Sequence, residues 1–173
     1  SKKVPQLFVA TGATKWNDSK DFPWTMGWQP SYQSETQIYA KWLLKEKPGA
    51  KIGVLYQNDD YGKDYLKGLK DGLAAKGAKM IVAEATYEVS DPTVDSQIQQ
   101  LKASGADTFV IFALPKQAIQ AFVIAAKLGW KPTECVTAVS IYPAVRKLLH
   151  LNAGEQTGGG PRPAPLPPRP RPP

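Results

Sequence analysis

Residues 51–87 read KIGVLYQNDDYGKDYLKGLKDGLAAKGAKMIVAEATY, and their pattern decides the fold class. The apolar run 52–56 is typical of a buried strand, and a polar turn follows it. The next leucines repeat at helical spacing: Leu66, Leu69 and Leu73. We expect this helix to end at Gly77 and a strand rich in Val, Ile and Ala to cover 80–87. The stretch therefore predicts a strand–helix–strand unit.

The alternation extends toward the N-terminus. The apolar residues 7–10 predict a buried strand, and a loop with a further strand near 24–28 follows it. A helix is expected to begin at Pro30-Ser31 and to stop at Pro48-Gly49. Apolar side chains four residues apart indicate the buried face of this helix: Ile38 with Trp42, and Tyr39 with Leu43.

The alternation also extends toward the C-terminus. One helix is expected up to Gly105, from apolar residues at helical spacing: Val94, Ile98 and Leu101. Residues 108–113 predict another buried strand. Pro115 suits the first position of a helix that runs to Gly129, and 136–139 is the expected last strand.

Strands and helices thus alternate through about 140 residues, and the strands are apolar on both faces. Strands of this kind form a parallel sheet that helices cover on both sides, joined by right-handed crossovers. The sequence therefore predicts an α/β, Rossmann-like fold.

The charge of the chain is divided unevenly. The formal net charge is +7, of which residues 1–140 contribute +3 and residues 141–173 contribute +4. In the first part the signs are interspersed as on an ordinary solvated surface, so we do not expect it to bind nucleic acid. One cysteine and one histidine, Cys135 and His150, cannot form a disulfide or a multi-ligand metal site within the chain.

The last segment has a different composition. Residues 158–173 are mostly glycine, proline and arginine, so we expect a disordered or polyproline II tail. The change from lysine to arginine suggests an out-of-frame reading or a cloning scar that begins between about Ser140 and Leu151. Alternatively, residues 165–171 match a proline-rich ligand of SH3 domains, and the chain would then be an interaction protein.

The loops after the strands hold the candidate site residues, because ligands of open parallel sheets bind outside the carboxyl ends of the strands. The first loop consists of Thr11, Gly12, Ala13 and Thr14. Its backbone N–H groups and two hydroxyls could bind an anion, although a plain glycine turn is the commoner explanation. Tyr61, beside a glycine, is expected to form the wall of a small-molecule pocket. Pro115 and Ser140 lie in loops at the same edge.

Patterns typical of catalysis or metal binding are missing. Asp59 and Asp60 lack the spaced oxygen ligands of a calcium loop, and such a pair more often caps a helix. Dinucleotide, phosphate-loop and nucleophile-elbow motifs do not occur. We therefore expect no catalytic residue, no metal and no cofactor.

Four stretches resemble the leucine/isoleucine/valine-binding protein family, the periplasmic substrate-binding subunits of ABC importers. They are residues 5–32, KIGVLYQNDDYGKD at 51–64, DTFVI at 107–111 and AAKLGWKP at 125–132. The resemblance covers about residues 4–140 in unbroken order.

The resemblance implies a type I periplasmic binding protein, in which two α/β lobes close on a ligand. Residues 1–29 would be the end of the first lobe and the hinge crossing, residues 30–140 the second lobe, and residues 141–173 an atypical tail. The rest of the first lobe would be missing from this fragment. No signal peptide is visible at the N-terminus.

The resemblance also implies roles for the site residues. The loop matching Gly12–Thr14 binds the carboxylate of the ligand, and the tyrosine matching Tyr61 packs on the ligand from the other lobe. Positions near Pro115 and Ser140 face the cleft. Some amino-acid binders carry an acid near Ser140 that this sequence lacks, which leaves an aromatic or other organic acid open beside an amino acid.

The implied partners are this small molecule and an ABC permease in the membrane. A flavodoxin-like or receiver-like enzyme or signalling domain is the alternative, since it shares the alternating pattern. A receiver, however, would carry acidic residues where the first strand ends in Thr11-Gly12.

Overall fold

Four parallel strands form the central sheet, in the order β4-β3-β5-β6. The computed structural model describes residues 4–141. The strands of this sheet are β3 (Ile52–Gln57), β4 (Ile81–Tyr87), β5 (Thr108–Phe112) and β6 (Thr133–Val136). The central strands β3 and β5 are buried along almost their whole length, as their apolar runs predict. The predicted parallel α/β fold is confirmed.

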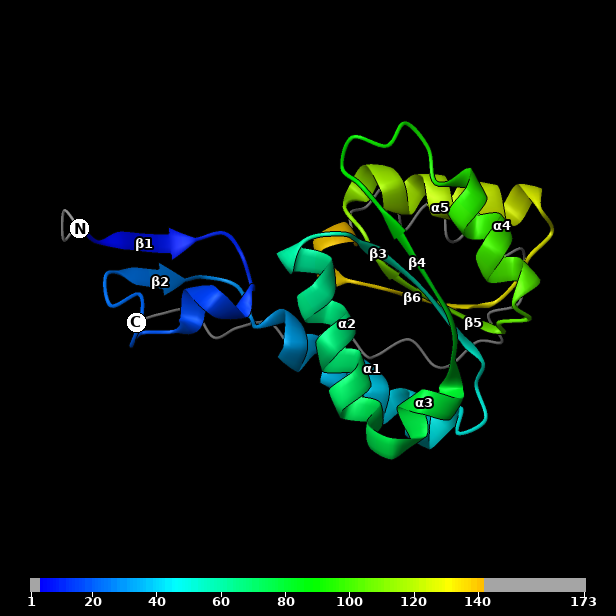
Figure 1. Ribbon diagram of the computed structural model, residues 1–173, viewed down its shortest axis with the longest axis horizontal. Helices are drawn as coiled ribbons and strands as arrows, with labels where there is room; N and C mark the ends of the chain where they lie inside the picture. Colours follow the sequence, from blue (N-terminus) through cyan, green and yellow to red (C-terminus); the bar gives the residue numbers. More distant parts are fainter. Residues whose placement is uncertain (1–3, 142–173) are drawn as a thin grey trace, which may run out of the picture.

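Helices cover both faces of this sheet (Figure 1). The helices on one face are α1 (Tyr32–Glu46), α2 (Asp60–Leu73) and α3 (Gly77–Met80). Those on the other face are α4 (Asp95–Ala103) and α5 (Pro115–Lys127). The side chains of the sheet alternate between two core clusters: Val54, Val110 and Phe112 pack toward α1 and α2, whereas Leu55, Phe109 and Ile111 pack toward α4 and α5. We call residues 30–141 the α/β body.

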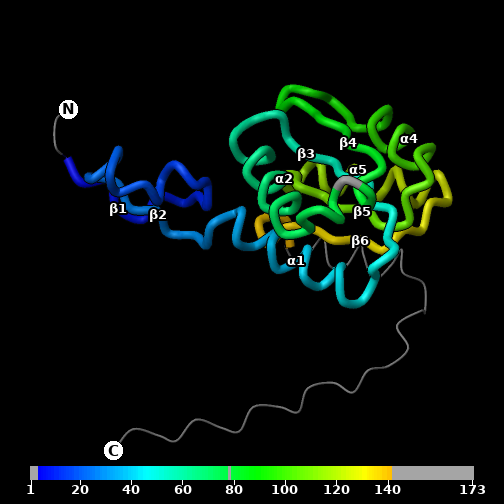
Figure 2. The backbone as a smooth tube through the Cα atoms, turned by 60° about the horizontal axis from the view of Figure 1, so that its bottom comes forward, coloured from blue at the N-terminus to red at the C-terminus, as the bar shows by residue number. Residues whose placement is uncertain are grey.

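The N-terminal segment forms a separate two-stranded sheet, in which β1 (Gln6–Val9) pairs in parallel with β2 (Thr25–Gly27). A 3₁₀ turn, η1 (Thr14–Asn17), lies between these strands. Figure 2 shows that this segment extends away from the α/β body. We call residues 4–29 the N-terminal ribbon.

The ribbon corrects one prediction. Strand β1 exists, but it is not buried: Leu7 and Phe8 are 59% and 56% exposed. The reason is that β2 is the only strand paired with β1 among residues 4–141, and neither face of the pair lies in a core cluster.

Helix α1 corrects a second prediction. Ile38 and Trp42, expected on its buried face, are 65% and 45% exposed. The other predicted pair is confirmed, since Leu43 is fully buried and Tyr39 packs against the core. The remaining buried residues of α1 are Tyr32, Thr36 and Ala40. Ala40 permits a close approach to α2, where a Cβ added at Gly72 would lie 2.6 Å from the Ala40 side chain. Close helix packing, rather than the size of the apolar groups, selects the buried face here.

Two element ends also differ from the prediction. Helix α2 stops at Leu73 because Ala74 takes a positive φ of 49°. Gly77 has an ordinary helical φ and opens α3, so it is not the C-terminal glycine. The last strand is β6 at Thr133–Val136, not 136–139, because its pairing with β5 begins at Thr133 and residues 138–140 form a 3₁₀ turn.

Candidate functional site

The N-terminus of α2 lies at the carboxyl end of β3, where it positions the candidate tyrosine. The side chain of Asp59 accepts a hydrogen bond from the Gly62 N–H at 3.2 Å and caps the helix, as predicted. Gly62 packs against the strand so closely that an added Cβ would lie 2.0 Å from the Gln57 carbonyl oxygen. The Asp59 cap and the close packing of Gly62 therefore fix the first turn of α2, and with it the direction in which the Tyr61 side chain points.

Tyr61 and Ser140 meet at the end of β5. The Tyr61 hydroxyl donates to the Ala113 carbonyl at 3.1 Å, and the Ser140 hydroxyl donates to the same oxygen. The Tyr61 hydroxyl also lies 3.3 Å from Thr137 Oγ1. Burial raises the pKa of Tyr61 far above its ordinary value, so the phenol is neutral. Pro115 opens α5 two residues beyond Ala113, at the same edge of the sheet.

The first candidate loop joins this group through Tyr32 of α1. The Tyr32 hydroxyl lies 3.3 Å from Thr11 Oγ1, and its ring packs edge-to-face on Tyr61 at 5.2 Å. Gly12 is buried beneath this contact, since an added Cβ would lie 2.2 Å from the Pro30 carbonyl oxygen. The structure therefore brings the predicted site residues of the ribbon and of the α/β body to one place.

Two backbone N–H groups of this loop, those of Ala13 and Thr14, already have acceptors. The Ala13 N–H donates to Thr11 Oγ1 at 3.2 Å. The Thr14 N–H donates to Asp64 Oδ2 at 2.6 Å, across to α2. The other oxygen of Asp64 accepts from Gln33 Nε2 at 2.8 Å.

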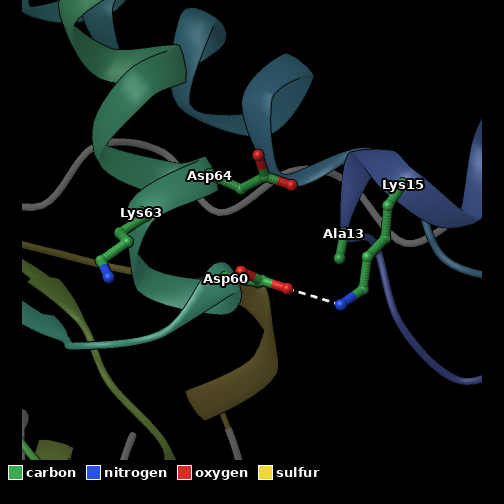
Figure 3. A pocket seen from close by; sticks show the side chains of 5 residues that line it. All are labelled: Ala13, Lys15, Asp60, Lys63 and Asp64. Carbon is green, nitrogen blue, oxygen red and sulfur yellow. Dashed lines mark hydrogen bonds and ion pairs between the residues drawn. The ribbon is translucent and has the colours of Figure 1, made fainter.

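A small cavity of about 230 Å³ lies between the loop and α2 (Figure 3). Its lining residues are Ala13, Lys15, Asp60, Lys63 and Asp64. Lys15 and Asp60 form an ion pair across it, with 2.5 Å between Nζ and Oδ2. The pair raises the pKa of Lys15 and lowers that of Asp60, mainly through their hydrogen bond. Both side chains are largely exposed, so water screens this pair.

The predicted site residues and the cavity coincide only in part. Ala13 lines the cavity, whereas Tyr61 packs inward on Tyr32 and does not line it. The charged lining residues Lys15, Lys63 and Asp64 were not predicted. Asp60 and Asp64 are four residues apart and therefore share one face of α2, and this spacing was the available signal. Lys15 follows the predicted loop directly, but no sequence pattern assigns it to a site.

Residues 4–141 contain neither a candidate metal site nor a candidate membrane-spanning helix. No group of three or more His, Cys, Asp or Glu side chains in this part of the chain could hold a metal ion. No helix there is long and apolar enough to cross a membrane. His150 and the proline-rich motif lie outside the described residues, as does the suspected frame change beyond Ile141.

Comparison with known families assigns the chain. The model of a family described as periplasmic binding protein matches residues 1–165, and the chain belongs to this family. A search of curated proteins gives no significant match.

Solved structures of similar fold support this assignment. A substrate-binding periplasmic protein from Ralstonia solanacearum has 27% identity and a TM-score of 0.71, over 86% of this chain and 41% of that chain. A branched-chain amino acid ABC transporter protein from Thermus thermophilus with bound valine has 14% identity and a TM-score of 0.73, over 87% and 39%.

A third similar structure contains a different ligand. It is a solute-binding protein of an ABC transporter from R. palustris in complex with 4-hydroxybenzoate, with 19% identity and a TM-score of 0.69, over 83% of this chain and 40% of that chain. The chain thus spans about two fifths of the length of these proteins.

Proposed function

We propose that the chain is part of the extracytoplasmic, periplasmic solute-binding component of an ABC importer. In this proposal it binds an amino acid or an aromatic or other organic carboxylate between two lobes, delivers it to a membrane permease, and catalyses no reaction. Family membership supports the class of protein. The ligands named in similar structures, valine and 4-hydroxybenzoate, support the class of ligand.

The observation that carries the proposal is the junction between loop 11–14 and the first turn of α2. The loop follows β1 of the ribbon, and α2 belongs to the α/β body. At the junction, Ala13 and Lys15 lie on one side of a cavity and α2 lies on the other, and the Thr14 N–H beside them donates to α2. Hydrogen-bond donors and a cation in one loop are suited to binding a carboxylate.

The proposed mechanism depends on the assignment of loop 11–14 and α2 to different lobes. We assign residues 1–29 to the end of the first lobe and the hinge crossing, and residues 30–140 to the second lobe. A ligand that touches both sides binds the closed arrangement more tightly than the open one and therefore shifts the population toward it. The closed form would be the one that docks on the permease.

A thermal-shift screen of the full-length protein, with the neighbouring coding sequence restored in frame, tests the proposal. The panel consists of L-valine, L-leucine, L-phenylalanine, benzoate and 4-hydroxybenzoate. We expect at least one acid to raise the melting temperature in a concentration-dependent way. A flat screen on a folded, two-lobed protein would contradict the proposal.

A substitution locates the binding to the loop. Thr14→Val removes a hydroxyl expected to donate to the ligand, so we expect about tenfold weaker binding of the acid found in the screen. Thr86→Val is the matched control, because Thr86 is exposed on β4 and lies outside the cavity lining. Equal affinities for the two variants would place the ligand elsewhere.

A further inference from the structure

Asp64 of α2 contacts a distant part of the chain. It lies in the second turn of α2 and is only partly buried, yet it reaches the loop of the N-terminal ribbon. Its Oδ2 accepts the Thr14 N–H at 2.6 Å, 50 residues away in the sequence. A charge-assisted hydrogen bond of this length is among the stronger polar contacts between exposed segments.

The donor that Asp64 uses is one that the proposed function needs. A ligand carboxylate at loop 11–14 would accept from its backbone N–H groups, and a carboxylate of the protein is already bound to one of them. The Ala13 N–H is bound within the loop, to Thr11 Oγ1. An incoming acid therefore meets an occupied site whose occupant has the same chemistry as the acid itself.

The surroundings of Asp64 allow it to leave. Its second oxygen accepts from Gln33 Nε2 of α1 at 2.8 Å, so the carboxylate keeps a partner when Thr14 is released. Asp60, the other acid of the cavity, is paired with Lys15 and makes no hydrogen bond to the Thr14 N–H. To free the Thr14 N–H for a ligand, Asp64 therefore has to give up only one hydrogen bond.

We propose that the Asp64 carboxylate is an internal competitor for the carboxylate of the ligand and thereby sets the affinity of the site for acids. This inference rests on the proposed function. In the ligand-free state Asp64 fastens the loop to α2, and the ligand displaces it from the Thr14 N–H. Asp64 acts through the donor and does not contact the bound ligand.

Calorimetric titration of the full-length protein with 4-hydroxybenzoate and L-valine tests the competitor. Asp64→Ala removes the competing acceptor, so we expect the probe that binds to do so about tenfold more tightly. Asp64→Asn keeps a neutral acceptor and should fall between Asp64→Ala and the wild type. Asp71→Ala is the matched control, since Asp71 is on the same helix and pairs with Lys67, away from the loop.

Each outcome decides the question. Tighter binding by Asp64→Ala with an unchanged Asp71→Ala supports the competitor, as does binding that appears only in Asp64→Ala. Unchanged or weaker binding by Asp64→Ala overturns it; weaker binding would mean that Asp64 contacts the ligand, and the proposed function would stand. Binding of neither probe by any variant, together with a flat thermal-shift screen, would overturn the proposed function and the competitor with it.

Discussion

The N-terminal ribbon and the α/β body contain similar apolar strands but bury them very differently. The strand β1 carries Leu7 and Phe8, which are more than half exposed, whereas every residue of β5 is buried. The difference comes from the layers around each strand: β5 lies between two strands and beneath helices on both faces, and β1 pairs with β2 alone among the described residues. An apolar run thus predicts a strand, but only its neighbours determine burial.

The same comparison explains where the candidate site lies. Loop 11–14 and the adjacent Lys15 meet the body through polar contacts, Thr14 with Asp64 and Lys15 with Asp60, and through Ala13, which is buried in the core cluster of α1 and α2. Contacts of this kind between exposed groups are weak and reversible compared with a buried core. These two exposed polar contacts are therefore the contacts of the junction that a ligand could replace most readily.

The largest expected effect is on the core of the body. Phe109→Ala removes a fully buried ring that packs on Trp130, so we expect the free energy of unfolding to fall by about 3–5 kcal/mol. Phe8→Ala in the ribbon should cost less than about 1 kcal/mol, because Phe8 is exposed. Urea unfolding measures both values, and equal costs would break the comparison.

A smaller effect is expected at the junction itself. Gly12→Ala places a Cβ 2.2 Å from the Pro30 carbonyl oxygen and 2.7 Å from the Tyr32 ring, so the backbone must shift. We expect a loss of about 2 kcal/mol in urea unfolding. Gly49→Ala is the control, since nothing lies within 4 Å of its added Cβ, and it should change stability by less than about 0.5 kcal/mol. Equal values would mean that the loop does not depend on this close approach.

The contribution of tyrosine ionisation at alkaline pH should come from the body alone, because residues 4–29 contain no tyrosine. Burial raises the pKa of Tyr87 to about 12, and burial also raises the pKa values of Tyr61 and Tyr65. Above pH 10 the unfolded tyrosines lose protons that the folded ones keep, so stability falls as the pH rises. Tyr87 alone should account for about 1 kcal/mol at pH 11.

Tyr87→Phe provides the test of this pH dependence. Its stability should fall less between pH 8 and pH 11 than that of the wild type, whatever the substitution costs at pH 8. Urea midpoints at the two pH values measure the difference. An identical decrease in both proteins would show that Tyr87 does not titrate as described.

The smallest expected effect is that of the exposed ion pair. Lys15→Ala should leave the urea midpoint of the body unchanged, because Lys15 and Asp60 are both largely exposed and screened by water. Asp60→Ala should behave in the same way. A clear loss of stability in either variant would mean that the ribbon and the body are fastened more firmly than their contacts indicate.

The order and type of the body's elements could be predicted from the sequence, because strands buried on both faces give uninterrupted apolar runs such as 108–113. The last strand was misplaced because β6 is an edge strand interrupted by the charged Glu134, so its run is short and mixed. The buried face of α1 was predicted correctly for Leu43 but not for Ile38 and Trp42, because the small side chain of Ala40 is what allows α2 to approach.

The candidate site was predictable only on its ribbon side. The loop 11–14 follows a strand and contains a glycine between hydroxyl residues, which is a local pattern. Asp64 meets Thr14 across 50 residues, and such a contact depends on how the ribbon docks on α2. The roles of Tyr61, Pro115 and Ser140 in ligand binding stay predictions.

Calorimetric titration of one acid into two proteins tests the central claim most directly. The acid is the one found by thermal shift, and the proteins are the full-length protein and residues 1–173 alone. If the ligand binds between two complete lobes, the full-length protein should bind it at least about a hundredfold more tightly than residues 1–173, which hold the proposed second lobe but only the end of the first. Equal affinities, at the micromolar level in the fragment, would contradict the claim and place the whole site within residues 1–173.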